Sequence, residues 1–419
     1  MAIHQQLTND LTWVGVQDPQ LKDFDIIMET EYGTTYNAYL LKGLEKTALI
    51  ETVKLPFFDE FRKRIEAVLP ITQIDYLIVN HTEPDHAGSI ARLLEINPDL
   101  TVVGSPAALQ FLKEIVNQDF RSLIAKEGMT LDLGGKTLQL IMAPNLHWPD
   151  TMYTLAQEDG ILFTCDSFGA HYAFEGLRVS EVKDHEAYQS ALKYYYDHIL
   201  KPFRPFMRKA LDKVEGLDVK MICPGHGPVL DCGLDGIIEQ YRQWNVEPQL
   251  ENKLILAYVS AYGYTEQLAQ AIARGIESAG WQAELVELTQ TPVAEVVEKL
   301  EQARGFLLGS PTILAEALPP VWMLLSYLNP VVHGGKYAAV FGSYGWSGEA
   351  FAHLEERLKQ LRITVMPALE VRFKPSPAQL AEAEQAGRRW VEQITGEPNN
   401  PMVSRLKQEA MSDIADIKD

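Results

Sequence analysis

The chain has 419 residues, of which 46% are hydrophobic, and it carries a formal net charge of -20 with a pI near 5.0. This length and composition predict a globular protein of two or three domains, each of roughly 100 to 200 residues. An acidic surface repels polyanions, so the charge argues against nucleic acid or an anionic membrane as a partner. No apolar run approaches the ~20 residues that cross a bilayer, and the first residues, "MAIHQQLTNDLTW", lack the basic and apolar regions of a signal peptide. We therefore expect a cytoplasmic protein.

The three cysteines, Cys165, Cys223 and Cys232, are irregularly spaced, and no C-x-x-C pair occurs. Such a set cannot form a disulfide framework, a rubredoxin-type iron site or a structural zinc site. We expect all three to be reduced packing residues.

In the first 245 residues, short apolar strands are expected to alternate with helical segments and loops. The run Tyr76–Val79 predicts a buried strand, and Pro84 is expected to delay any helix until about Ala87. The loop between them would then present four potential metal ligands: His81, Glu83, Asp85 and His86. Loops held by rigid strands are common places for functional sites.

Three later segments repeat this arrangement, because each is an apolar run that ends in a potential ligand. They are "LQLIMAPNLHWPD", "GILFTCDSFG" and "VKMICPGHG", which deliver His147, Asp166 and His226. Burying several carboxylates together without cations costs several kcal/mol each, and metal ions remove that cost. Seven ligands exceed one tetrahedral site and suit two ions with one bridging carboxylate. The other histidines are expected to be ordinary core or surface residues: His4, His171, His185, His198, His333 and His353.

The polar stretch "WNVEPQLENK", Trp244 to Lys253, reads as a connector between domains. After it, strands alternate regularly with helices, which predicts a doubly wound sheet of five parallel strands. The expected strands are 254–260, 283–288, 305–310, 337–343 and 364–371, and the expected helices are 265–280, 293–303 and 349–361. The predicted domains are therefore 1–249 and 250–396. Residues 397–419 are polar and charged, and we expect them to form a tail outside the folded core, with at most a short helix.

The second predicted domain opens with a strand, a small polar loop from Ser260 to Thr265, and an amphipathic helix. A helix N-terminus can bind a phosphate with its free N–H groups, and the hydroxyls of Ser260 and Thr265 can add hydrogen bonds. The loop lacks the G-K-[ST] of a nucleoside triphosphatase and the three glycines of a dinucleotide site, so a monophosphate such as that of FMN fits best. An ordinary helix cap is the alternative explanation for these hydroxyls.

Two further loops, "GSPTI" and "FGSYGWSGEA", follow parallel strands on the edge where doubly wound sheets bind ligands. They resemble the flavodoxin loops that flank an isoalloxazine ring. Thr312 could hydrogen-bond the ring, and Tyr344 or Trp346 could stack on it. The expected FMN contacts of the three loops are Ser260, Ala261, Tyr262, Gly263, Tyr264, Thr265, Ser310, Pro311, Thr312, Ile313, Ser343, Tyr344, Gly345 and Trp346.

The pattern H-x-E-x-D-H, followed by the distant His, Asp and His, resembles the metallo-β-lactamase-like fold of flavodiiron proteins, also called A-type flavoproteins. The flanking segments "GTTYNAYL", "LHWPD" and "CDSFG" are similar too. The resemblance implies an αββα sandwich with one iron on His81, Glu83 and His147 and the other on Asp85, His86 and His226, bridged by Asp166. The hydrolytic branch has H-x-H-x-D-H, so Glu83 replaces a histidine with a hard oxygen ligand that favours iron.

Two features of the resemblance concern the surroundings of the metals. Tyr195 resembles a family tyrosine near the irons that could donate a hydrogen bond to a bound intermediate, and core packing is its alternative role. Many family members carry a histidine upstream of the "GTTYN" segment, whereas "KDFDIIMETEYGTTYN" has none.

The second half resembles flavodoxin over roughly residues 251 to 395. Together the halves imply a reductase that converts dioxygen to water, nitric oxide to nitrous oxide, or both, with electrons passing through FMN from a separate donor such as rubredoxin or a reductase. The resemblance also implies a head-to-tail homodimer, or a dimer of dimers. Two alternatives remain at this stage: a dizinc hydrolase with an accessory flavodoxin-like domain, and a flavodoxin-like electron carrier whose metal site is only structural.

Overall fold

The computed structural model describes residues 5–26, 28–247 and 249–396. Their contacts divide the chain into two compact units. The boundary lies in the sequence between Val246 and Glu247, close to the boundary expected at 249/250. His4 and the tail predicted at 397–419 lie outside the described residues. Among the described helices, none is long and apolar enough to cross a membrane.

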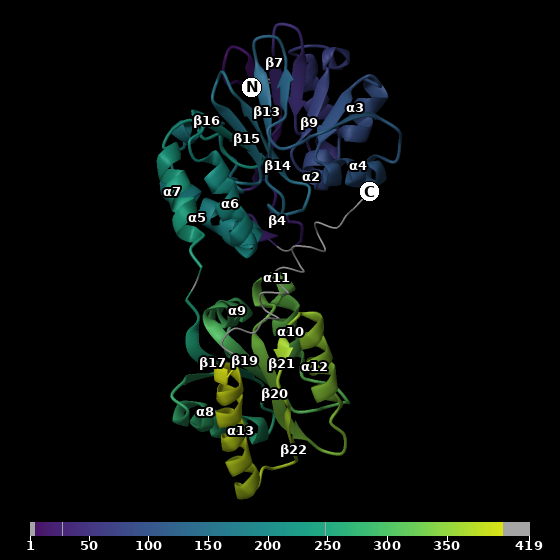
Figure 1. The fold of residues 1–419 in the computed structure, drawn as a ribbon. Coiled ribbons are helices and arrows are strands. Elements are labelled where there is room, and N and C mark those ends of the chain that lie inside the picture. Colours follow the sequence, from purple (N-terminus) through teal and green to yellow (C-terminus); the bar gives the residue numbers. More distant parts are fainter. Residues whose placement is uncertain (1–4, 27, 248, 397–419) are drawn as a thin grey trace. The chain divides into compact units, whose positions relative to one another are not determined.

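The first unit contains two stacked sheets with helices on both outer faces (Figure 1). The described strands of the first sheet are, in spatial order, β1 (Gln5–Gln6), β2 (Leu11–Trp13), β7 (Tyr39–Lys42), β8 (Thr47–Ile50), β9 (Tyr76–Val79), β10 (Thr101–Gly104) and β11 (Arg121–Ile124). Those of the second sheet are β12 (Thr130–Asp132), β13 (Thr137–Met142), β14 (Met152–Ala156), β15 (Ile161–Cys165) and β16 (Met221–Pro224). Two small antiparallel ribbons pair β3 (Val16–Asp18) with β6 (Thr34–Tyr36) and β4 (Asp23–Phe24) with β5 (Met28–Glu29).

The outer helices are amphipathic and bury one face each against a sheet. The described helices on the first sheet are α1 (Phe58–Glu66), α3 (Ile90–Ile96) and α4 (Pro106–Val116), and those on the second are α5 (His185–Tyr195), α6 (Arg204–Val214) and α7 (Leu234–Trp244). The short helical segments are α2 (Pro84–Ala87), η1 (Leu55–Phe57), η2 (Ile71–Gln73), η3 (Val179–Glu181), η4 (Tyr196–Leu200) and η5 (Lys201–Phe203). These layers confirm the predicted αββα sandwich.

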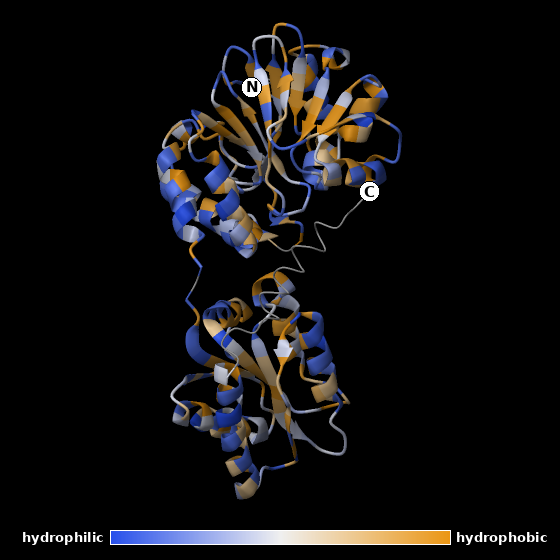
Figure 2. Cartoon of the chain, viewed as in Figure 1, coloured by the Kyte–Doolittle hydropathy of each residue, from blue (hydrophilic) through white to orange (hydrophobic). Residues whose placement is uncertain are grey.

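The strands of the sandwich are apolar on both faces because both faces are covered. In β9, Leu77 and Val79 pack against the outer helices, whereas Ile78 packs between the sheets. Figure 2 shows the hydrophobic residues, in orange, concentrated on the strands of this unit. The predicted buried strand at Tyr76–Val79 is confirmed with these same limits.

The expectation that Pro84 delays the following helix is wrong. Helix α2 begins at Pro84 and ends at Ala87, so Asp85 and His86 lie on a helical turn and only His81 and Glu83 lie on the preceding loop. Proline is tolerated in the first turn because its missing N–H has no partner there in any helix, and its fixed φ suits that position.

The second unit is a sheet of parallel strands covered by helices on both faces (Figure 1). Its described strands are, in spatial order, β18 (Gln282–Glu287), β17 (Glu251–Tyr258), β19 (Ala303–Gly309), β20 (Tyr337–Tyr344) and, both beside β20, β21 (Thr364–Val365) and β22 (Leu369–Arg372). This order, 2-1-3-4-5, is that of flavodoxin. The predicted fifth strand is split in two at Pro367, which cannot donate a hydrogen bond to a neighbouring strand.

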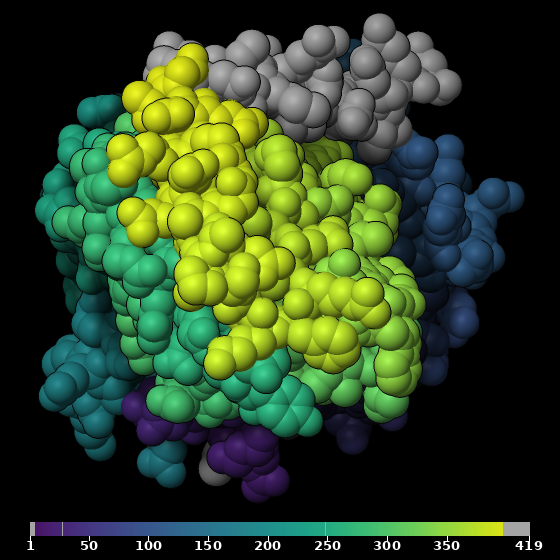
Figure 3. Space-filling view, turned by 90° about the horizontal axis from the view of Figure 1, so that it is seen from below, coloured from purple at the N-terminus to yellow at the C-terminus, as the bar shows by residue number. Residues whose placement is uncertain are grey.

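Helices α8 (Tyr264–Ser278) and α13 (Pro377–Gly396) cover one face of this sheet. The described helices on the other face are α9 (Val293–Gln302), α10 (Pro319–Tyr327) and α12 (Glu349–Gln360), and α11 (Pro330–His333) is a single turn before β20. The sequence analysis had not found α10, α11 or α13. Figure 3 shows α13, in yellow, on the surface beside α8.

Two glycines allow α8 and α13 to approach closely. A Cβ on Gly275 of α8 would lie 1.9 Å from the carbonyl oxygen of Glu384, and one on Gly387 of α13 would lie 2.3 Å from that of Ile272. Gly275→Ala should therefore force the helices apart and lower the free energy of unfolding by about 1–3 kcal/mol, measured by urea denaturation of the full chain. Gly396→Ala, at an open position, is the control. Equal midpoints for the two variants would contradict this packing argument.

Candidate metal centre and cofactor loops

Strand ends bring the seven predicted metal ligands together. His81 and Glu83 follow β9, Asp85 and His86 lie on α2, and the other three follow β13, β15 and β16: His147, Asp166 and His226. Strands β13 and β15 both run antiparallel to β14, and β16 is parallel to β15, so the last three ligands leave the same edge of their sheet.

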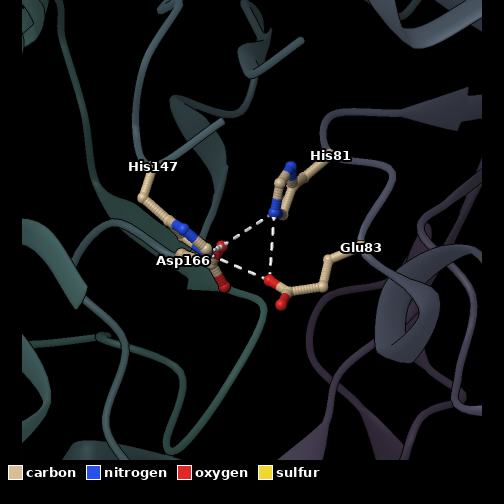
Figure 4. Close-up of side chains that lie close together, drawn as sticks. All are labelled: His81, Glu83, His147 and Asp166. Carbon is tan, nitrogen blue, oxygen red and sulfur yellow. Dashed lines mark hydrogen bonds and ion pairs between the residues drawn. The ribbon is translucent and has the colours of Figure 1, made fainter. Parts of the chain in front are cut away.

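The first group of ligands consists of His81, Glu83, His147 and Asp166, whose ligand atoms all lie within 4.8 Å of one another (Figure 4). Glu83 Oε2 lies 3.0 Å from His147 Nε2 and 3.3 Å from His81 Nε2. Asp166 Oδ2 lies 3.5 Å from His81 Nε2 and 3.7 Å from His147 Nε2. Two imidazoles and two carboxylates therefore converge on one small volume.

The second group consists of Asp85, His86 and His226, again with ligand atoms within 4.8 Å. Asp85 Oδ2 lies 3.0 Å from His226 Nε2 and 3.5 Å from His86 Nε2. The other carboxylate oxygen of Asp166, Oδ1, faces this group, at 3.2 Å from His86 Nε2 and 3.7 Å from His226 Nε2. Asp166 thus presents one oxygen to each group, which is the arrangement of a bridging ligand.

The electrostatics of the centre favour bound cations. Burial alone would raise the pKa of Asp166, but the adjacent imidazoles of His86, His81 and His147 together outweigh it and hold that pKa well below its usual range. Burial lowers the pKa of His86, whereas the carboxylates of Asp85 and Asp166 raise it overall to about 10. Asp85 Oδ1 is buried, and no residue that the structure describes forms a hydrogen bond with it. A donor set of imidazoles and carboxylates with excess negative charge fits two metal ions of the kind that accept mixed nitrogen and oxygen ligands, non-haem iron among them.

Outer partners orient two of the ligand rings, and the sequence analysis missed them. Asp150 Oδ2 accepts hydrogen bonds from the N–H (2.7 Å) and the hydroxyl (2.8 Å) of Thr82 and lies 3.3 Å from His81 Nδ1. The carbonyl of Thr35 accepts the Nδ1–H of His226 at 2.6 Å, which leaves Nε2 of that ring for a metal. Asp150 belongs to the "LHWPD" segment, but nothing in its spacing indicates that it reaches back to Thr82.

Two more side chains adjoin the centre. The buried hydroxyl of Tyr195 donates to Asp166 Oδ1 at 2.9 Å, and burial together with Asp166 raises the pKa of Tyr195 well above its usual value. His171, expected to be an ordinary core or surface residue, is buried, with its ring centroid 4.8 Å from that of Tyr195 and 5.2 Å from that of His226. The other described histidines outside the ligand set do not line the centre: His185, His198 and His353 are exposed, and His333 is buried in the second unit.

The turn between β4 and β5 also approaches the metal centre. Burial, followed by the charges of Glu83 and Asp85, raises the pKa of Asp25. This aspartate lies in the "KDFDIIMETEYGTTYN" segment, which has no histidine. This segment therefore places the carboxyl group of Asp25, and no histidine, near the metal centre.

The three predicted FMN loops follow β17, β19 and β20, which are neighbouring parallel strands, so the loops lie along one edge of the second sheet. Ser260 Oγ accepts the N–H of Glu266, in the first turn of α8, at 3.2 Å. Thr265 Oγ1 and Thr312 Oγ1 are buried, and neither has a hydrogen-bond partner among residues 5–26, 28–247 and 249–396. These two hydroxyls, with the N-terminus of α8, fit a phosphorylated ligand that has hydrogen-bonding groups on its ring system.

Comparisons with known proteins agree with both halves of this architecture. A family model described as "ODP family beta lactamase" matches residues 34–227, and one described as "Flavodoxin" matches residues 256–387. The chain is 41% identical to flavo-diiron protein FprA2 of Clostridium acetobutylicum, covering 93% of this chain and 99% of that one. It is 36% identical to a nitric oxide reductase of Moorella thermoacetica, covering 93% and 98%. The solved structure of rubredoxin oxygen:oxidoreductase from Desulfovibrio gigas aligns with a TM-score of 0.70 at 26% identity, covering 94% and 100%.

Metal binding should stabilise the protein more at higher pH. Since the folded-state pKa of His86 is raised from 6.5 to about 10, its contribution to the stability of metal-free protein is complete below pH 6.5 and is lost as the pH rises towards 10. Metal affinity rises over the same range, because protons compete for the imidazoles. The increase in melting temperature on metal loading, measured by calorimetry against chelator-treated protein, should therefore grow from about pH 6 to about pH 9. A constant or shrinking increase would contradict this charge balance.

Proposed function

The chain belongs to the flavodiiron protein family, and on that premise we propose that it reduces dioxygen to water, nitric oxide to nitrous oxide, or both. The cofactors of this family are a non-haem pair of irons and FMN. One relative is named as a nitric oxide reductase and one solved structure as a rubredoxin oxygen:oxidoreductase, so the comparisons favour a diiron flavoprotein oxidoreductase over a dizinc hydrolase. The observation that carries the proposal is the seven-ligand cluster, buried except for the partly buried Glu83 and His147, in which Asp166 faces both groups.

We assign one iron to His81, Glu83 and His147 and the other to Asp85, His86 and His226, with Asp166 bridging. The distances within each group support this division, as do the two oxygens of Asp166, which face different groups. A carboxylate at position 83 in place of a histidine favours iron over zinc.

We assign the FMN phosphate to the N-terminus of α8 and the loop Ser260–Thr265, and the ring to the loops 310–313 and 343–346. The unpartnered hydroxyls of Thr265 and Thr312 support this assignment. Within the first loop Gly263 has φ +76, a conformation that glycine adopts without strain, and it leaves the helix end open to a ligand.

When bound, the reduced iron pair and reduced FMN supply two electrons each, which together meet the four that dioxygen needs. The residues of the protein position the metal ligands and keep a hydrogen-bond donor protonated beside them. Burial keeps Tyr195 protonated, so its hydroxyl remains a hydrogen-bond donor beside Asp166. The Thr35 carbonyl fixes the tautomer of His226, and Asp150 orients His81.

As the source of the electrons we propose a separate donor protein, either rubredoxin-like or a reductase. We also propose a head-to-tail homodimer, in which each flavin faces the iron pair of the other subunit. The support is the exposure of apolar side chains beside the flavin loops, with Tyr262 at 78%, Leu314 at 95% and Trp346 at 91%. A monomeric mass in light scattering at full activity would rule the dimer out. The free cysteines suit a reducing compartment, which we propose to be the cytoplasm.

The direct test begins with protein purified without oxygen. We expect about two irons and one FMN per chain, and consumption of dioxygen or nitric oxide once the flavin is chemically reduced. Metal analysis, flavin absorbance and gas electrodes measure these quantities on one sample. Two zinc ions with no gas consumption would refute the proposal and return the site to the hydrolases.

Tyr195→Phe removes one hydroxyl without changing the packing. Because a hydrogen bond to a charged group contributes about 1.5–3 kcal/mol, kcat for gas reduction should fall about 10- to 100-fold while the iron content stays at its wild-type level. The control is Tyr188→Phe, on the same helix, because the Tyr188 hydroxyl is buried and has no hydrogen-bond partner in the described part of the chain. Equal kcat values for the two variants would show that Tyr195 only packs.

A further inference from the structure

The two residues that follow β8, Glu51 and Thr52, form a turn. This turn contacts both ends of the segment from Asn80 to His86, which carries the first four ligands. Glu51 is buried, and its φ of +64 is a strained value for a glutamate. Its Oε1 accepts the backbone N–H of Asn80, directly before His81, at 2.9 Å. The N–H of Thr52 donates to the carbonyl of His86 at 2.9 Å, and the Thr52 hydroxyl donates to the same oxygen. The backbone of the ligand segment is therefore fixed at both ends by this turn.

The same turn reaches the ring of His86. One carboxylate oxygen of Glu51, one ring nitrogen of His86 and Sγ of Cys165 lie within 4.8 Å of one another, and all three residues are buried. Because Nε2 of His86 faces Asp166 at 3.2 Å, Nδ1 lies on the opposite side of the ring. Glu51 Oε2 and His86 Nδ1 are both buried atoms without a hydrogen-bond partner among the described residues.

The other buried ligand rings have the partner that His86 lacks. His81 Nδ1 faces Asp150 at 3.3 Å, and His226 Nδ1 donates to the carbonyl of Thr35 at 2.6 Å. Metal-bound histidines almost always donate their second N–H to a carboxylate or a carbonyl, which fixes the tautomer and the ring orientation. Glu51 Oε2 can accept a hydrogen bond and His86 Nδ1–H can donate one, and both residues belong to one small cluster. We therefore expect these two atoms to form a hydrogen-bonded pair.

We propose that Glu51 is a positioning residue whose free carboxylate oxygen accepts the Nδ1–H of His86 and holds Nε2 of that ring towards the second iron. The inference rests on the proposed diiron function. Of the two groups assigned to the irons, His86 belongs to the one with Asp85 and His226, so Glu51 controls the affinity of the second metal position and leaves the first unchanged. Loss of an outer partner of this kind typically costs 10- to 100-fold in metal affinity.

The test compares Glu51→Gln with wild type as iron-loaded protein. Glutamine has nearly the same shape and can still accept the Asn80 N–H, but it then turns an N–H2 group towards the Nδ1–H of His86. We expect one iron to transfer to a ferrous chelator 10- to 100-fold faster than in wild type, and the other at the wild-type rate. Mössbauer spectra of 57Fe-loaded protein should change for one of the two irons only.

Two further variants separate positioning from general stability. Ser89→Ala removes a buried hydrogen bond of 2.7 Å to the Val53 carbonyl in the same region, and both irons should keep their wild-type release rates. Glu51→Asp keeps the acceptor but shortens its reach, so one iron should leave at an intermediate rate. This variant also replaces Glu51→Gln as the test if the latter does not fold.

The proposal is overturned if both irons of Glu51→Gln leave at wild-type rates, or if both leave faster by the same factor. A wild-type protein that holds zinc and consumes no gas would refute the diiron function instead. The Glu51 comparison would then be made with zinc and a colorimetric zinc chelator, and selective loss of one zinc would still support the positioning role.

Discussion

The first unit depends on one costly feature, the burial or partial burial of four imidazoles and three carboxylates within a few ångströms of one another. Removing charged groups from water costs several kcal/mol per ion, and attraction between the groups repays this only when the geometry is good and cations balance the anions. Protons on the histidines could supply part of that balance, and the raised pKa of His86 reflects this. Two metal ions supply it by binding the same ring-nitrogen and carboxylate lone pairs that protons would otherwise occupy. The two sheets and the outer helices of the first unit hold the seven ligand side chains in place.

That support comes from strand direction. Parallel strands end at the same edge of a sheet, so ligands far apart in sequence meet when each directly follows such a strand. His147, Asp166 and His226 are brought together in this way by β13, β15 and β16. The loops that we assign to the flavin follow the same rule on β17, β19 and β20. Two different chemistries therefore rest on one topological feature, although one sheet is wholly parallel and the other mixed.

The same rule explains how much the sequence could predict. Residues that follow apolar runs, such as Asp166 and Thr265, could be proposed as site residues from the sequence. Local periodicity indicates the strand, and the direction of the strand places the residue at the edge of the sheet where ligands bind. Asp150 and Glu51 could not, because a long-range contact from a loop leaves no periodic signal. Pro84 misled the prediction, because a proline that ends one helix can begin another. The split of the fifth strand at Pro367 and the unpredicted helix α10, which begins with prolines, also depend on how tertiary packing uses this residue.

Backbone strain gathers around the metal centre. Of the described non-glycine residues with positive φ, Glu51, Asn145, Cys165 and Phe168 all lie within two residues of a proposed ligand or contact one of its partners. Such conformations cost on the order of 1–3 kcal/mol each and persist only where the surrounding structure enforces them. Structural metal binding can contribute about 10 kcal/mol or more, enough to offset several of them. The strained turns place the ligands, and the bound metals in turn stabilise the strained turns. The metal centre and the fold of the first unit are therefore expected to form together.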